Sequence, residues 1–98
     1  MSDLQALRTR INEVDEALLA LFVEREEICI QIGEVKRAQG KAILDTSREQ
    51  EKIRGNVAYV EGKLAASNLT DAQKDCVRVG TENLTQQLMA EGRRIQGC

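Results

Sequence analysis

The chain has 98 residues, a formal net charge of −2 and neither histidine nor proline. At this length we expect one small domain, 1–98, near the lower limit for burying a self-sufficient core. The charge gives no overall attraction to nucleic acid or to acidic membranes. The lack of histidine argues against a zinc site and against a histidine-activated nucleophile.

Abundant Ala, Leu, Glu, Gln, Arg and Lys predict an all-α fold. The cysteines, Cys29, Cys76 and Cys98, lack metal-ligand spacing, so we expect neither a metal nor a cofactor. Because no segment resembles a signal peptide or reaches transmembrane length, we expect no membrane partner and a cytoplasmic location.

The first predicted helix covers about 3–39. Ser2 and Gln5 have the spacing of a capping box, and Gly40 is a typical stop. Such a helix is about 54 Å long, too long to hide its apolar stripe alone, which favours an oligomer. The stripe has heptad-like spacing and comprises Leu4, Leu7, Ile11, Val14, Leu18, Leu21, Ile28, Ile32 and Val35.

Arg25 occupies the one polar position on that stripe. A guanidinium there is either aimed at an anion or is a snorkelling or ion-paired structural residue. Lys36 follows about 16 Å along the axis and only ~20° off the same face, although it could also be a surface lysine. Arg8 lies roughly 100° away from Arg25, so it is expected to reach a pocket of a partner subunit rather than that of its own chain.

A second helix is predicted over 46–64, after a joint that contains Asp45. Thr46 and Glu49 have capping-box spacing, so Glu49 is either a capping residue or a site residue. A third helix is predicted over 70–95, opened by Thr70 and Gln73. The expected apolar face of the second helix is Ile53, Val57, Val60 and Leu64, and that of the third is Ala72, Cys76, Val79, Asn83, Gln86 or Gln87, and Ala90.

Each helix thus carries polar residues on its expected buried face. Taken alone, Asn83 and Gln87 fit a solvated end of the third helix better than a site. Taken together, the cations, one carboxylate and the amides predict an interior site for a small polyanion. Chemistry there would depend on positioning and electrostatics, because no nucleophile or metal is available.

The first half of the chain resembles the all-helical AroQ class of chorismate mutases. The resemblance covers Leu4 to Ile53 and is carried by four motifs in order: LR-x-x-I-x-x-x-D at Leu7 to Asp15, LLALFVER ending in Arg25, IGEVK ending in Lys36, and D-x-x-RE at Asp45 to Glu49. It implies an intertwined homodimer of three-helix chains that rearranges chorismate to prephenate in aromatic amino-acid biosynthesis.

The resemblance also implies roles for individual residues. Arg25 and the Arg8 of a second chain would clamp the two carboxylates of chorismate. Lys36 would donate to a carboxylate and to the breaking ether oxygen, and Glu49 with the backbone of Asp45 would hold the ring hydroxyl. The same resemblance assigns Arg48 to a carboxylate, Gln87 to the ether oxygen and Asn83 to a position where the family often has a small hydroxyl residue.

The third helix matches the family least, and its register leaves Gln86 and Gln87 as alternatives for the ether donor. We prefer Gln87, because the other register would bring Glu82 beside an anionic substrate. The functional alternatives are an isochorismate-pyruvate lyase, an aminodeoxychorismate mutase or a non-catalytic helical partner of a shikimate-pathway enzyme. Glu49 favours a hydroxyl-bearing substrate such as chorismate.

Overall fold

The computed structural model describes residues 2–98, which form three α-helices and no strand. Helix α1 covers Asp3–Ala38, α2 covers Thr46–Ala65 and α3 covers Asp71–Gln96. The expected all-α class is confirmed, and these bounds differ from the expected ones by no more than one residue at either end.

Two helix starts and one helix end follow the expected local chemistry. Ser2 and Gln5 exchange side-chain and backbone hydrogen bonds at the start of α1, and Thr70 and Gln73 do the same at the start of α3. Gly40, just after α1, has φ of 68°, a conformation that side chains with a Cβ rarely adopt. These signals explain why the bounds were predictable.

The start of α2 differs from the expected capping box. Asp45 is the capping residue, and its side chain accepts a hydrogen bond from the backbone N–H of Arg48 at 3.1 Å. Thr46 is therefore the first helical residue, because the carboxylate one position earlier already satisfies a free N–H of the first turn. Glu49 is left available for another contact.

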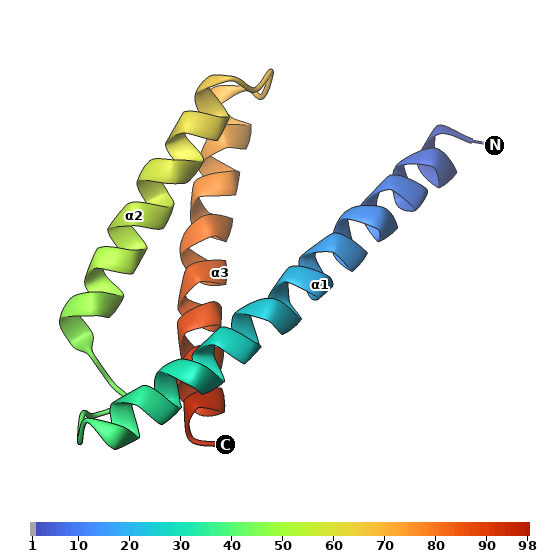
Figure 1. The fold of residues 1–98 in the computed structure, drawn as a ribbon. Helices are drawn as coiled ribbons and strands as arrows, with labels where there is room; N and C mark the ends of the chain where they lie inside the picture. The colour runs from blue at the N-terminus through green and yellow to red at the C-terminus, as the bar shows by residue number, and fades with distance from the viewer. Residues whose placement is uncertain (1) are drawn as a thin grey trace.

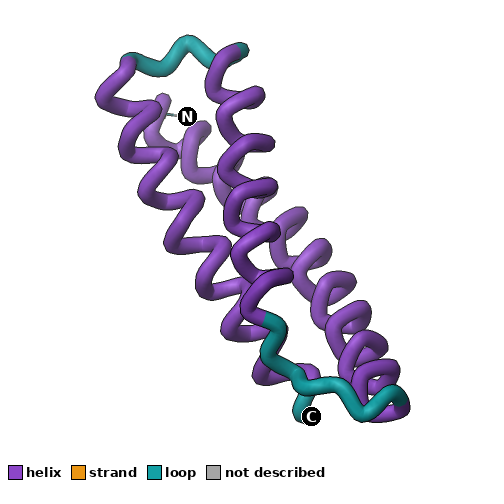
Figure 2. Tube along the Cα trace, turned by 90° about the vertical axis from the view of Figure 1, so that its left-hand side faces the viewer, coloured by secondary structure: helices purple, strands orange, loops and turns teal. Residues whose placement is uncertain are grey.

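The helices α2 and α3 form an antiparallel hairpin, and α1 crosses the open end of that hairpin (Figure 1). Helix α3 packs against both other helices, whereas the N-terminal half of α1 stands away from them. The two joints lie at opposite ends of the elongated molecule (Figure 2), which measures 54 × 29 × 17 Å. At the open end of the hairpin α3 contacts both other helices, whereas α1 and α2 do not contact each other within the described residues.

The hairpin interface is only partly apolar. On α2 the expected face is confirmed, since Leu64 is buried and Ile53 is half-buried. On α3, however, Val79 of the expected apolar face is 59% exposed, whereas Thr85 is buried and accepts a hydrogen bond from Asn56 at 3.2 Å. The expected face of α3 was wrong for this contact, because small and polar residues make it.

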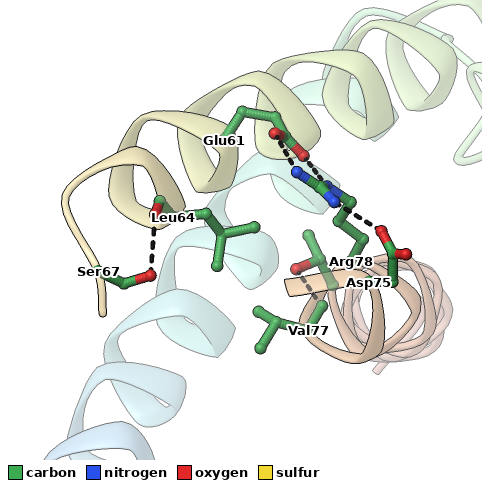
Figure 3. A network of polar contacts seen from close by, with 7 residues as sticks. Glu61, Leu64, Ser67, Asp75, Val77 and Arg78 are labelled. Carbon is green, nitrogen blue, oxygen red and sulfur yellow. Dashed lines mark hydrogen bonds and ion pairs between the residues drawn. The ribbon is translucent and has the colours of Figure 1, made fainter. Parts of the chain in front are cut away.

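Ion pairs also connect the hairpin, away from its open end. Arg78 of α3 donates from Nε and Nη2 to the two carboxylate oxygens of Glu61 at 2.6 and 3.0 Å, and from Nη1 to Asp75 at 2.6 Å (Figure 3). These hydrogen bonds from Arg78 hold the pKa of the Glu61 carboxyl below its ordinary value of 4.5.

The crossing of α1 and α3 is tightest at Gly33. A Cβ on this residue would lie 2.6 Å from the backbone oxygen of Gln96, so only glycine allows the observed approach. Arg37 donates to the same oxygen at 2.8 Å. Gly33 thereby fixes where the last turn of α3 meets α1.

Candidate active site

A cavity of about 350 Å³ lies at the open end of the hairpin, between the second half of α1, the first turns of α2 and the last turns of α3. Five cationic and two acidic side chains line it: Arg25, Lys36, Arg48, Lys52 and Arg93 against Asp45 and Glu49. The remaining lining is largely apolar and comprises Ile28, Cys29, Ile32, Ile43, Met89, Gly92 and Gln96. The excess of cations suits a small dianion.

Arg25 is held against α3. Its Nη1 donates to the backbone oxygen of Leu88 at 2.8 Å and lies 3.9 Å from the sulfur of Cys29. Gly92 lies against the guanidinium, since a Cβ there would be in van der Waals contact with the same nitrogen at 3.5 Å. The arginine is thus positioned before any ligand binds, with its other nitrogen atoms available for an anion.

Lys36 is held against the joint between α1 and α2. Its Nζ donates to the backbone oxygen of Ile43 at 2.7 Å, which leaves two of its three protons for other acceptors. Asp45 also lines the cavity, but its side chain caps α2 as described above. Arg48 makes only a loose 3.7 Å ion pair with Glu51 at the surface, so its guanidinium can turn towards the cavity.

Glu49 contacts a residue that the sequence analysis missed. Both carboxylate oxygens lie 2.6 Å from Nη1 of Arg93, in the last two turns of α3. The two side chains are 23% and 36% exposed, and both line the cavity. Arg93 could have been found only from the pairing of α2 with α3, because nothing in its local sequence distinguishes it from Arg94.

Asn83 and Gln87 do not line the cavity, and both are exposed, as is Gln86. The amide that α3 brings to the cavity is Gln96, which is buried and whose Oε1 has no hydrogen-bond partner among the described residues. Gln87 precedes Gln96 by nine residues, which corresponds to about 13 Å along the helix and ~180° around it. The two amides therefore point in opposite directions.

Arg8 is exposed on the N-terminal half of α1, which stands away from the hairpin. It lies 17 residues before Arg25, or about 25 Å along the helix axis. It does not line the cavity of its own chain.

Two further observations concern the whole described chain. Within residues 2–98 no helix combines the length and the apolar character needed to cross a membrane. The same residues bring together no group of three or more side chains of the kinds that commonly ligate metals.

Comparisons with known proteins identify the family of this sequence. The family model of chorismate mutase type II matches residues 7–97. A bifunctional chorismate mutase/prephenate dehydratase of Escherichia coli (strain K12) is 40% identical over 50 residues, which is 51% of this chain and 13% of the relative. The T-protein of Enterobacter agglomerans is 43% identical over 49 residues, which is 50% of this chain and again 13% of the relative.

This chain therefore spans only about an eighth of the length of these curated relatives. No solved structure matches it significantly. The family model, however, covers nearly the whole chain rather than half of it, and includes the third helix as well as the first two. The chain belongs to the chorismate mutase type II family.

Proposed function

We propose that the chain is a chorismate mutase that rearranges chorismate to prephenate. The observation that carries this proposal is the convergence of Arg25, Lys36 and Glu49 on one cavity of substrate size. The reaction breaks a C–O bond and forms a C–C bond within one molecule, so it requires no acid, base or cofactor. A binding site that holds a dianion in its compact reactive conformer is sufficient.

Each residue would contribute in a definite way. Arg25 would bind one carboxylate, and Lys36 would donate to a carboxylate and to the ether oxygen on which negative charge grows. Glu49 would accept a hydrogen bond from the ring hydroxyl, near the backbone of Asp45, and Arg48 would support a carboxylate. We assign the amide donor to Gln96 instead of Gln87, since the NH₂ group of a buried cavity-lining amide can reach a bound ether oxygen.

The proposed enzyme is a homodimer in which Arg8 of one chain completes the cavity of the other. The single chain exposes 7553 Å², whereas a compact protein of its mass exposes about 5,600 Å². The excess for two chains, about 3,900 Å², falls in the range of total area that obligate homodimers bury. The apolar stripe of α1 is the main exposed surface that a second chain would cover, with Leu4, Leu7, Ile11, Val14, Leu18 and Leu21 all more than half exposed.

We further expect the enzyme to act in the cytoplasm. Cys29, Cys76 and Cys98 are all free thiols, which is typical of a reducing compartment. Prephenate made there would be available for aromatic amino-acid biosynthesis.

The test is turnover of chorismate with identification of prephenate, measured for the wild type, Arg25→Ala and Arg54→Ala. Arg54 is an exposed arginine of α2 outside the cavity and serves as the matched control. We expect a loss of about a hundredfold or more in kcat/KM for Arg25→Ala and little change for the control. An inactive wild type, or an Arg25→Ala variant with full activity, would refute the proposal.

Subunit mixing tests the role of Arg8. Arg8→Ala and Arg25→Ala should each be nearly inactive, but a mixed dimer contains one site with both arginines intact. Random mixing should restore about a quarter of the wild-type activity, because half of the dimers are mixed and each has one intact site. Mixtures that stay inactive would argue against a shared site.

A further inference from the structure

Glu49 and Arg93 form an unusual ion pair for this molecule. Two arginine–glutamate pairs connect α2 with α3, and they differ in geometry. Arg78 uses two nitrogens, one for each oxygen of Glu61, and both side chains are about 40% exposed at the surface. Arg93 instead places a single nitrogen, Nη1, 2.6 Å from both oxygens of Glu49 at the wall of the cavity.

This geometry leaves the Glu49 carboxylate able to accept another hydrogen bond. An ionised carboxylate has about four acceptor sites, and the contact with Nη1 occupies roughly one on each oxygen. The carboxylate is 23% exposed and lies at the cavity wall, so a hydroxyl inside the cavity can use the remaining sites. The pair is therefore compatible with hydroxyl binding.

Without Arg93, other cations would compete for the same carboxylate. Lys52 follows Glu49 by three residues on α2, which is the spacing of neighbouring side chains on a helix, and it also lines the cavity. A carboxylate drawn to Lys52 would follow a flexible side chain instead of a fixed one from the opposite helix. Arg93 thus supplies a counter-ion whose position depends on the packing of α3 against α1 and α2.

We propose that Arg93 is a positioning residue that orients the Glu49 carboxylate to accept the ring hydroxyl of the substrate and so makes the cavity selective for hydroxyl-bearing dianions. This inference deepens the proposed function and rests on it for the identity of the natural substrate. It assigns Arg93 no direct contact with the substrate.

The test is a double-mutant cycle of Arg93→Gln and Glu49→Gln, read out by calorimetric binding of two unreactive probes. The probes are an oxabicyclic dicarboxylate with one ring hydroxyl and the same compound without it. Arg93→Gln also removes a positive charge, but that effect is similar whether or not Glu49 is present and cancels in the cycle. Arg94→Gln, at the adjacent residue outside the cavity, measures the effect of charge alone.

We expect Arg93→Gln to weaken binding of the hydroxylated probe about tenfold more in the wild-type background than in the Glu49→Gln background. The deoxy probe should show no such difference. Arg93→Lys should recover part of the affinity, because it restores a cation facing Glu49. Thermal unfolding of each variant identifies any that fails to fold, and Arg93→Met, which also removes the cation, then replaces Arg93→Gln in the cycle.

Any of three results would overturn the inference: equal losses in both backgrounds, equal coupling for both probes, or no binding of either probe by the wild type. The outcome is independent of turnover. A wild type that shows the coupling but leaves chorismate unchanged would refute the proposed function and not the role of Arg93. A wild type that forms prephenate without the coupling would refute only the role of Arg93.

Discussion

Replacing Gly33 by alanine should destabilise the protein, although alanine is the better helix former. The Cβ of the new alanine would lie 2.6 Å from the backbone oxygen of Gln96, 3.0 Å from the Cα of Gln96 and 3.1 Å from the Cβ of Gln96. These atoms belong to the backbone and the base of a side chain, so rotamer changes cannot relieve the contact. The last turn of α3 must move away from α1, and the 2.8 Å hydrogen bond from Arg37 to the same oxygen would weaken.

The magnitude follows from opposing effects. Overpacking of this kind costs about 1–3 kcal/mol, and the weakened hydrogen bond to a charged donor adds roughly 1 kcal/mol. The gain in helix propensity from glycine to alanine offsets about 1 kcal/mol. The expected net loss is therefore about 1–3 kcal/mol, or a decrease in Tm of roughly 4–24 °C for a domain of this size.

Gly62→Ala is the matched control, since it is also helical and a Cβ there would meet nothing within 4 Å. It should raise the free energy of unfolding by about 1 kcal/mol. The assay is urea unfolding of both variants and the wild type at one protein concentration, because the proposed dimerisation would make stability depend on concentration. A Gly33→Ala variant as stable as Gly62→Ala would refute the close approach of α1 and α3.

Three further predictions concern other contacts. Thr85→Val should cost about 1–2 kcal/mol of unfolding free energy in urea titrations, because it leaves the amide of Asn56 without its buried acceptor. The ion pair of Glu61 contributes stability above the ordinary carboxyl pKa of 4.5, and this contribution is lost as the pH falls through the lowered pKa of the folded state. Glu61→Gln should therefore flatten the decline in Tm on acidification. An unchanged decline would contradict the pairing of Glu61 with Arg78. If the wild type forms the proposed dimer, Ile11→Asp should sediment as a monomer at the same concentration, because it places a charge on the apolar stripe of α1.

The helices could be predicted because their signals are local. Capping residues such as Ser2 and Thr70 and a left-handed Gly40 act within a few residues of the chain. The same holds for the relative positions of Arg25 and Lys36, because both lie on α1 and its regular geometry sets the angle and the distance between them. Helix phase alone places them on one face, and both line the cavity.

The contribution of α3 could not be predicted in the same way. Its contact with α2 relies on Thr85 and ion pairs, so an apolar pattern does not mark the packed face. Its register at the open end depends on the lengths of α2 and of the second joint and on the approach allowed by Gly33. For this reason Gln96 and Arg93, rather than Gln87, line the cavity.

Binding at the cavity should also depend on how the helices pack at the open end of the hairpin. Arg25 and Lys36 are held by backbone oxygens of Leu88 and Ile43, which belong to α3 and to the first joint. Neither cation can keep its place if the segment that supplies its acceptor moves. Because both cations are already held in place, they lose little side-chain entropy when the proposed dianion binds. Small displacements of the last turns of α3 should therefore reduce activity before they reduce the cooperativity of unfolding.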